Sequence, residues 1–578
     1  MELASSSPAE GKAGVRCFPF LKSRRKSRFE SVRRKIPLHY YYVLLCLIIL
    51  FFALLRFRLR DTPLERDEGE YAYAGQLMLQ GIPPYQFVYT MKLPGTSAAY
   101  AAILAVFGQT PAGIHTGLIF VNAATTLLVF LLGMRLYGRL AGLVAAASYA
   151  LSSTSPKVMG FAGHATHFVV LFAVAGILVL LKALESSRIW LFFAGGLLLG
   201  LGFLMKQPGL LFLLFAGVYV IQQEWKVPIN WRKLAVSTGS LALGGALPFV
   251  VTCLLLLRDG FFHKFWFWTF AYAQEYGTSE KLSDGITNLL GQTVAEIVGR
   301  ATVILLFIAL ILVTMKWSAH VRSHAFFTIS FLVFSALAVC PGFYFRNHYF
   351  ILMLPAVSIL AGMIVSGATE RLLLWHGSLA VAGLPLLFFM IAFSAAIFSQ
   401  RKFLFQMDPL EACRDRYWSN PFPEAVEIAN YIKNHSPEDA TVAVLGSEPE
   451  IYFYSHRHSA TGYIYMYPLL EPQRYALAMQ KQMIGEIEAA SPDVMVFVNV
   501  SSSWVHTSQP RSTKDILLWV QGYVQQHYVM EGVADIGSAT EYHWGEKAKD
   551  ALPRWGEKAQ DALPRAQDCV WIFKRKSS

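Results

Sequence analysis

Long apolar runs alternate with short polar segments from about residue 39 to residue 400. Each run has roughly 17–25 residues, which is enough for a helix to cross the hydrocarbon core of a bilayer. A shorter apolar piece at 96–108 fits a re-entrant or interfacial helix. We therefore predict eleven membrane spans, at about 39–59, 113–135, 139–156, 164–183, 189–205, 208–223, 234–257, 299–315, 323–341, 347–367 and 376–399.

The charges between the apolar runs predict the orientation of the chain. A basic cluster directly precedes the first span, and no small-residue cleavage site follows, so this span is expected to be an uncleaved anchor. The cluster and the basic short loops predict a cytoplasmic N-terminus, with binding to anionic lipid head groups as the alternative role for the cluster. An odd number of spans then places the C-terminal region outside an inner (plasma) membrane. The cluster comprises Lys22, Arg24, Arg25, Lys26, Arg28, Arg33, Arg34 and Lys35.

The apolar runs end near residue 400, where charged residues, Pro and Asn return. Helix-like segments such as PEAVEIANYIKNH then alternate with strand-like segments such as TVAVLG and DVMVFVNV. This alternation favours a small α/β domain with a mainly parallel sheet. We predict a polytopic α-helical membrane protein with a basic cytoplasmic tail at 1–38, a transmembrane domain at 39–400 whose first outer loop is 60–112, and an extracytoplasmic α/β domain at 401–578.

The composition agrees with a membrane protein. Of the 578 residues, 54% are hydrophobic and 15% are charged, and the mean hydropathy is +0.41, whereas a soluble globular protein has about 25% charged residues. These values exclude a disordered protein, a coiled coil and an ordinary cytosolic enzyme. No Walker loop or G-x-G-x-x-G motif supports nucleotide binding, and no nucleic-acid partner is expected. Cys413 and Cys569 both fall in the outer domain and could pair in an oxidising compartment.

The first outer loop carries the most informative polar residues. Asp67 and Glu68 follow the first span by a few residues, and Lys92 lies further along the same loop. Adjacent carboxylates near the membrane surface can act as a general base or bind a cation. A solvated turn would also explain an isolated acidic pair, but further polar residues are expected on the same membrane face. These are Lys157, His164, His167, Lys206, Arg346 and His348.

Carboxylates and cations gathered on one face are what a site for a phosphorylated lipid needs, because cations bind the phosphate and a carboxylate takes a proton. An alternative is that these ionisable residues at the ends of spans have no functional role and only extend their charged groups to the membrane interface. His164 and His167 would share one face of a helix, but no further ligand is evident, so no metal site is predicted. A divalent cation, Mg²⁺ or Mn²⁺, at Asp67 and Glu68 is compatible with the sequence but not required by it.

Four motifs within residues 40–460 resemble those of the GT-C glycosyltransferases. RDEGEYAYAGQ with the following KLPG resembles their first-loop signature, and LMKQPGLLFL resembles their K-x-P turn. FRNHYFILMLPAVSILAG is similar to the late R-x-H-Y…L-P element, and TVAVLGSEPEIYFYSHR to an outer-domain segment of bacterial members. Within this class the chain resembles the branch with the protein O-mannosyltransferases and the lipid A aminoarabinose transferase (glycosyltransferase family 39-like). The GHATHF segment departs from the N-x-E-type residues usual in the family at that place.

The resemblance implies a membrane glycosyltransferase that takes a sugar from a polyprenyl-phosphate donor on the outer membrane face. The acceptor would be a glycan, a lipid or a protein, and the transfer would usually invert the anomeric carbon. Asp67 would be the general base or the carboxylate that orients the acceptor, and Glu68 would help to position the acceptor or a cation. The implied donor-phosphate site comprises Lys92, Arg346 and His348, with Lys206, His164 and His167 as further candidates.

Two other classes of protein remain open. A transporter or flippase for a lipid-linked substrate would also have many spans, but transporters often show inverted repeats and charges near mid-membrane. The sequence shows no such repeat, and its polar residues gather at one face. A binding scaffold would use the outer α/β domain to recruit a partner. The sugar and the acceptor are not identified by the sequence.

Overall fold

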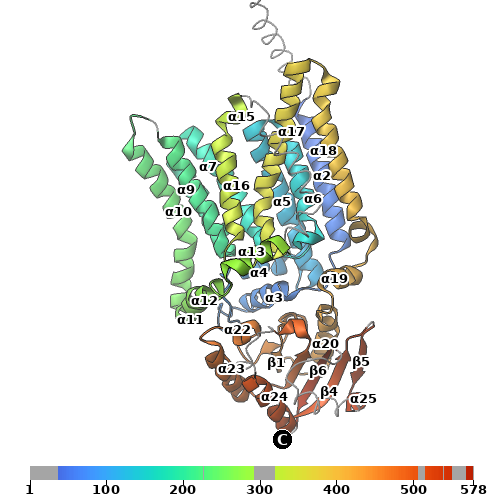
Figure 1. Ribbon diagram of the computed structural model, residues 1–578. Helices are drawn as coiled ribbons and strands as arrows, with labels where there is room; N and C mark the ends of the chain where they lie inside the picture. Colours follow the sequence, from blue (N-terminus) through green and yellow to red (C-terminus); the bar gives the residue numbers. More distant parts are fainter. Residues whose placement is uncertain are drawn as a thin grey trace, which may run out of the picture.

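The computed structural model describes residues 37–225, 227–291, 319–504, 514–537, 539–549 and 568–576. A bundle of long helices forms one end of the molecule, and a sheet with its covering helices forms the other (Figure 1). Shorter helices from the first outer loop and from residues 262–287 lie at the end of the bundle that faces the sheet. The basic N-terminal tail and the span predicted at 299–315 lie outside the described residues.

Six helical segments of the described chain are long and apolar enough to cross a membrane. Each coincides with a predicted span, because a continuous apolar run can satisfy its backbone only within its own helix when lipid surrounds it. The six establish a polytopic helical membrane protein, and the full count of eleven stays a prediction. They are α2 (Leu38–Arg58), α5 (Pro111–Tyr137), α7 (Ala165–Ser186), α10 (Trp231–Arg258), η5 with α17 (Asn347–Met353 and Leu354–His376) and α18 (Leu379–Ser399).

Shorter helices occupy the other described segments that were predicted to span. One of them, α8 (Ile189–Met205), packs closely against α10 through glycines. A Cβ on Gly200 would lie 2.2 Å from the carbonyl oxygen of Gly245, so only glycine permits this approach. The remaining short helices are α6 (Arg139–Ser153), α9 (Leu210–Glu224), α15 (Ala319–Ser323) and α16 (Ala325–Val339).

The first outer loop folds into two helices, α3 (Arg66–Leu79) and α4 (Gly95–Phe107). At the start of α3, the Glu65 side chain accepts a hydrogen bond from the Glu68 amide, and the Glu68 side chain accepts one from the Glu65 amide. This reciprocal capping fixes where α3 begins. The aromatic run after α10 is helical as α11 (Phe262–Trp266), the π-helix η3 (Phe267–Tyr272) and α12 (Ala273–Gly277), followed by α13 (Leu282–Thr287).

The C-terminal residues form a six-stranded sheet with strand order β2-β1-β3-β6-β4-β5. The mainly parallel sheet predicted from the sequence was wrong, because β6 runs antiparallel to both β3 and β4, and β4 runs antiparallel to β5. The β4–β5 connection at 536–540 is too short for a parallel crossover. The strands are β1 (Thr441–Leu445), β2 (His458–Ser459), β3 (Val494–Asn499), β4 (Tyr528–Asp535), β5 (Glu541–Trp544) and β6 (Cys569–Arg575).

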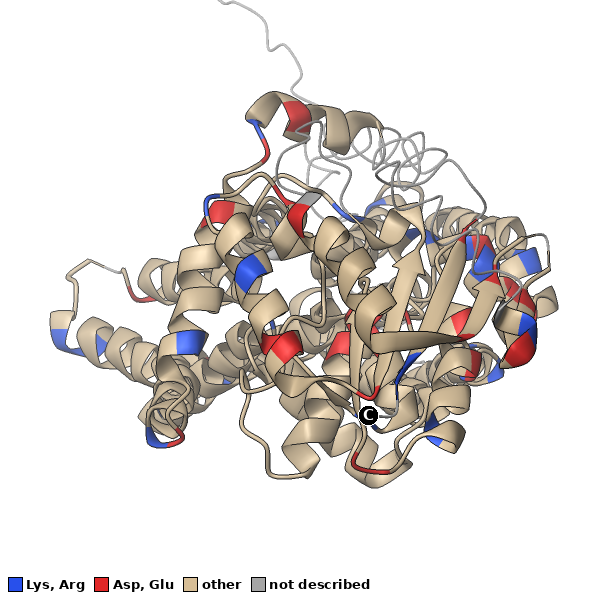
Figure 2. Cartoon of the chain, turned by 90° about the horizontal axis from the view of Figure 1, so that it is seen from below, with Lys and Arg blue, Asp and Glu red and all other residues tan. Residues whose placement is uncertain are grey.

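Helices before and between these strands complete the C-terminal part of the chain. Cys413 and Cys569 are both buried in it, and no disulfide joins them. Viewed from this end of the molecule, basic and acidic residues are interspersed along the ribbon (Figure 2). The helices are α19 (Pro409–Tyr417), α20 (Phe422–His435), α21 (Glu450–Ser455), α22 (Tyr467–Leu470), α23 (Ala476–Ala490), α24 (Lys514–His527) and α25 (Glu546–Lys549).

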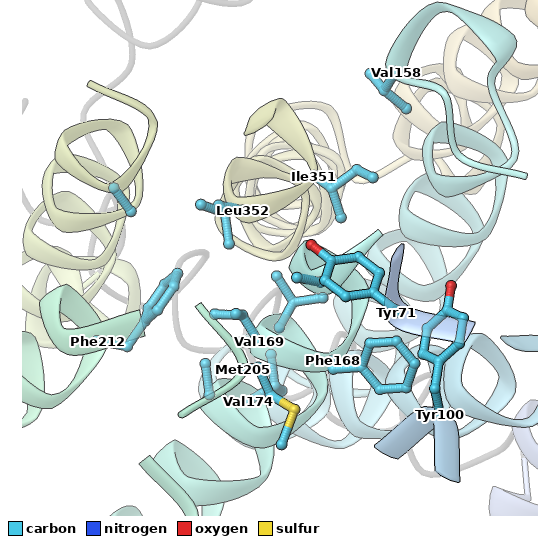
Figure 3. Close-up of a cluster of buried hydrophobic side chains, with 14 of the residues drawn as sticks. Tyr71, Tyr100, Val158, Phe168, Val169, Val174, Met205, Phe212, Ile351 and Leu352 are labelled. Atoms are coloured by element: carbon cyan, nitrogen blue, oxygen red, sulfur yellow. The ribbon is translucent and has the colours of Figure 1, made fainter. Parts of the chain in front are cut away.

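Aromatic packing joins α3 to the bundle. The rings of Tyr71 and Tyr100 lie 5.4 Å apart, and those of Tyr100 and Phe168 lie 6.0 Å apart (Figure 3). Tyr71, Met205 and Leu352 belong to this buried cluster and also line the cavity described below. One wall of that cavity is therefore part of a closely packed core, which limits the movement of α3.

Candidate functional site

A cavity of about 510 Å³ lies between the end of the helix bundle and the C-terminal sheet. Its walls come from α3, from the turn after α8, from α12, from η5 and from two C-terminal segments around residues 416–422 and 465–471. The cavity thus lies where the polar ends of several spans meet. Its size is that of an ordinary small-molecule site.

The structure brings six of the eight predicted site residues together on this cavity. They come from five separate segments of the chain, and all lie at the same end of the bundle. Glu68 and His167 do not line it. The six residues are Asp67, Lys92, His164, Lys206, Arg346 and His348.

Asp67 and Glu70 share one ammonium group. Lys92 Nζ donates to Asp67 Oδ1 at 2.8 Å and to Glu70 Oε2 at 2.8 Å. Burial alone would raise the pKa of the Asp67 carboxyl, but the Lys92 ammonium, together with His348 and His164, holds that pKa well below its usual range. Burial alone would lower the pKa of Lys92, but the two carboxylates raise it well above its usual value. Asp67 is therefore ionised at neutral pH.

Two histidines stack beside Asp67. The rings of His164 and His348 lie 4.1 Å apart and are inclined by 12°. His164 Nδ1 lies 3.6 Å from Glu65 Oε1 and 3.8 Å from Asp67 Oδ2. Burial lowers the pKa of His164 to about 4, so its ring is neutral at pH 7. A neutral imidazole can accept a proton or bind a metal ion.

The three side chains of Asp67, His164 and His348 offer ligand atoms that lie within 4.8 Å of one another. The sequence predicted no metal site, because only His164 and His167 could be paired from it. The structure stacks His348 on His164, whereas His167 does not line the cavity. One carboxylate oxygen and two imidazole nitrogens form a donor set that suits a divalent cation.

Lys206 and Arg346 supply positive charge to the cavity without a carboxylate beside them. Lys206 Nζ lies 4.1 Å from the centre of the Tyr349 ring, and Arg346 Cζ lies 5.5 Å from that of Tyr344. Within the described chain, neither cation forms an ion pair. Burial lowers the pKa of Lys206 to about 7. An anion in the cavity would stabilise both charges.

Local backbone structure places these two cations. Helix α8 ends at Met205, and Lys206 follows in an extended conformation. The side-chain amide of Gln207 donates to the carbonyl of Met91 at 2.7 Å, which fixes this turn against the first outer loop. Arg346 follows Phe345, which has a left-handed backbone with φ of 45°. Such a conformation is costly for a residue with a side chain and often occurs at functional sites.

Glu68 does not line the cavity, and its side chain instead makes structural contacts with neighbouring segments. Its Oε1 accepts a hydrogen bond from the Gly163 amide at 2.6 Å and lies 3.0 Å from His115 Nε2. Burial would raise the pKa of Glu68, but His115 and this amide lower it below its usual value. The expected place for Glu68 beside an acceptor or a cation does not fit these contacts. His167 is likewise buried on α7, away from the cavity lining.

The sequence missed several residues of the cavity wall. Glu70 could have been found, because it lies three residues after Asp67 and shares a face of α3 with it. Tyr465, Tyr467 and Glu471 come from the C-terminal domain, in which no residue was predicted to belong to a site. Their positions depend on how that domain docks on α3, and no local pattern carries this information.

Comparisons with known proteins fit this geometry. Residues 92–251 match the sequence model of a family described as dolichyl-phosphate-mannose-protein mannosyltransferase. A search of curated protein sequences gives no significant match.

Two solved structures of one protein share the fold over most of this chain. ArnT from Cupriavidus metallidurans bound to undecaprenyl phosphate has a TM-score of 0.52 and 13% identity, over 80% of this chain and 94% of that one. In the apo state it has a TM-score of 0.52 and 14% identity, over 86% and 96%. The Archaeoglobus fulgidus oligosaccharyltransferase tethered with an acceptor peptide has a TM-score of 0.47 and 11% identity, over 92% and 75%. The family match and the ArnT-like fold confirm the resemblance to GT-C glycosyltransferases.

Proposed function

We propose that the protein is a membrane glycosyltransferase that moves a sugar from a polyprenyl-phosphate donor to an acceptor glycan, lipid or protein. The observation that carries this proposal is the pair Lys206 and Arg346, two cations in the cavity that form no ion pair within the described chain. Lys206 is half-buried and Arg346 is exposed, and the phosphate of a lipid donor would pair with both charges. ArnT, which shares this fold, was solved with undecaprenyl phosphate bound.

The cavity also holds the carboxylate that the transfer needs. In the proposed reaction, an acceptor oxygen forms a bond to the anomeric carbon while the bond from that carbon to the phosphate oxygen breaks. Asp67 orients the acceptor hydroxyl and takes its proton, and polyprenyl phosphate leaves with its negative charge beside Lys206 and Arg346. Attack opposite the leaving phosphate inverts the anomeric carbon. General-base assistance of this kind contributes about 10²–10⁴-fold in rate.

The other predicted residues take supporting roles in this proposal. Lys92 holds Asp67 and Glu70 in place, since its ammonium already lies 2.8 Å from both carboxylates. His164 and His348 lie next to Asp67 and either bind a divalent cation or accept hydrogen bonds from the substrates. Glu68 braces α3. We place the site on the outer face of an inner (plasma) membrane, because the basic short loops of the sequence mark the opposite side as cytoplasmic.

The experiment that tests the proposal measures polyprenyl-phosphate-linked sugars by mass spectrometry. Cells that lack the chromosomal copy are complemented with the wild-type chain or with Asp67→Asn. We expect one intact lipid-phosphate sugar to accumulate without the wild-type chain, together with a glycan, lipid or protein that lacks that sugar. An unchanged pool, with the protein inserted and folded, would contradict a glycosyltransferase. Accumulation on one membrane face only, without loss of turnover in a reconstituted assay, would identify a transporter instead.

A further inference from the structure

Arg66, the residue before Asp67, makes its side-chain hydrogen bonds to the C-terminal part of the chain. Its Nε donates to the Ser447 carbonyl at 2.5 Å, and its Nη2 lies 3.0 Å from Glu448 Oε1. The residue is 8% exposed. Further hydrogen bonds join Nη1 to the Tyr467 hydroxyl at 3.1 Å and Nη2 to Asn420 Oδ1 at 3.2 Å.

The same guanidinium contacts the tyrosine wall of the cavity. Its Cζ lies 5.4 Å from the centre of the Tyr467 ring and 6.0 Å from that of the Tyr465 ring. Both tyrosines line the cavity, as does Asp67. Arg66 therefore lies between the carboxylate proposed to act on the acceptor and the wall that the C-terminal domain contributes.

The far side of Glu448 is also fixed. Its Oε2 accepts a hydrogen bond from the Ser503 hydroxyl at 2.6 Å, and Ser503 Oγ in turn accepts one from the Ser447 amide at 2.8 Å. The segment that binds Arg66 is thereby tied to the residues that follow β3. Arg66 thus contacts a part of the domain that is held in place by hydrogen bonds. Through Arg66, the position of that part can determine the position of α3.

A second contact holds α3 close to the same segment. A Cβ added at Gly69 would lie 2.6 Å from the Glu450 amide nitrogen and 2.9 Å from its Cα. The first turn of α3 and the start of α21 are therefore in backbone contact. Within the first turn of α3, Arg66 and Asp67 both line the cavity, and Arg66 and Gly69 both contact the C-terminal domain.

We propose that Arg66 is a positioning residue that uses Ser447 and Glu448 to hold Asp67 at a fixed distance from the Tyr465–Tyr467 wall. The C-terminal domain is then an obligatory part of the active site, not a separate recognition module. This inference rests on the proposed function, because it assigns Asp67 to the reaction. A displacement of about 1 Å at a reacting group can cost about 100-fold in rate.

The simpler explanation is that Arg66 only stabilises the domain interface, and the chain offers a matched control for it. Arg457 is also buried, and its guanidinium donates to the carbonyls of Lys433 at 3.0 Å and Ser436 at 2.8 Å. Its hydrogen bonds all stay within the C-terminal domain. Arg457→Lys should therefore reduce stability without moving Asp67.

The experiment compares Arg66→Lys, Glu448→Gln and Arg457→Lys as full-length chains in the complemented cells described above. Lysine keeps the charge of Arg66 but cannot make its several directed hydrogen bonds. Each variant is purified for thermal unfolding and for binding of undecaprenyl phosphate, a probe that carries no sugar. Turnover is read from the pool of lipid-phosphate sugar that accumulates in the cells.

We expect Arg66→Lys to lower turnover about 10–100-fold and Glu448→Gln to lower it in the same direction. Binding of undecaprenyl phosphate should stay within about twofold of wild type, since Lys206 and Arg346 are untouched. Normal turnover in Arg66→Lys would overturn the inference. Equal losses of turnover and stability in Arg66→Lys and Arg457→Lys would also overturn it. If the wild-type chain consumes no lipid-phosphate sugar, the proposed function fails, and the inference fails with it.

Discussion

Lys92 Nζ lies 2.8 Å from Asp67 Oδ1, so the ammonium group and the carboxylate proposed to act on the acceptor form a direct ion pair. The same ammonium lies 2.8 Å from Glu70 Oε2. Because one ammonium faces two carboxylates, this group of three side chains carries no net positive charge with which to attract a phosphate. Lys206 and Arg346 are the better candidates for the donor, and Lys92 instead keeps Asp67 ionised.

Asp67→Asn should abolish most turnover, because an amide cannot take the proton of the acceptor hydroxyl. We expect a loss of about 10²–10⁴-fold in donor consumption, with binding of undecaprenyl phosphate retained. Asp61→Asn is the control, since the Asp61 side chain is 65% exposed and forms a surface pair with its neighbour Arg60, at 3.6 Å. Equal activity in Asp67→Asn and Asp61→Asn would remove Asp67 from the reaction.

Lys92→Met should move the acid limb of the activity profile to higher pH. Burial raises the pKa of Asp67 and the Lys92 ammonium lowers it, so loss of that ammonium leaves the pKa higher. Asp67 would then be protonated, and inactive, at pH values where the wild-type chain still works. Donor consumption measured from about pH 3 to 8 checks this, because the pKa of Asp67 lies below the usual aspartate value of about 3.9 in the wild-type chain. Lys233→Met, which breaks a pair with Glu224, is the control. An unshifted limb would show that the ion pair does not set the protonation of Asp67.

Binding of undecaprenyl phosphate should weaken as the pH rises through about 7, because burial lowers the pKa of Lys206 to about 7. The side chain is charged and attracts the phosphate below this value, and it becomes neutral above it. Lys206→Arg is the control, since arginine stays protonated across the range and reports only the titration of the phosphate itself. Titrations at several pH values would contradict the prediction if the two chains showed the same dependence.

Arg346→Gln should weaken binding of undecaprenyl phosphate about 10–100-fold, as expected for loss of a charge-assisted hydrogen bond. The matched control is Arg401→Gln, because Arg401 is exposed and lies 4.2 Å from the centre of the Phe398 ring, away from the cavity. Binding measured in detergent for both variants checks the assignment. Unchanged affinity in Arg346→Gln would place the phosphate elsewhere.

Gly69→Ala should reduce stability by about 1–3 kcal/mol, the usual cost of overpacking. The new methyl group would lie 2.6 Å from the Glu450 amide nitrogen, so α3 and α21 must separate. Gly485→Ala on α23 is the control, because nothing lies within 4 Å of its Cβ position and alanine favours a helix. Thermal unfolding of both chains tests this. An unchanged midpoint in Gly69→Ala would mean that α3 and α21 can separate without a loss of stability.

The apolar runs predicted the helices of the bundle well, because helix formation in lipid depends on the hydropathy of one continuous segment. The described segments expected to span are all helical, and six are long enough to cross. The motifs around Asp67, Lys206 and Arg346 were also found from the sequence, since Lys206 and Arg346 stand at the ends of apolar runs and Asp67 follows one by a few residues. The direction of the strands could not be predicted from the sequence. The alternation of helices and strands does not show that the last strand, β6, lies between β3 and β4 in the sheet.

The composition of the site was decided by contacts between distant segments. The sequence paired Asp67 with Glu68, and His164 with His167, because each pair is adjacent or shares a helix face. Folding instead turned Glu68 towards His115 and brought His348 onto the ring of His164. The hydrogen bonds from Arg66 to the C-terminal domain likewise exist only once that domain has docked. Hydropathy and spacing are local properties, whereas the membership of a cavity depends on which surfaces pack together, and only the tertiary structure determines that.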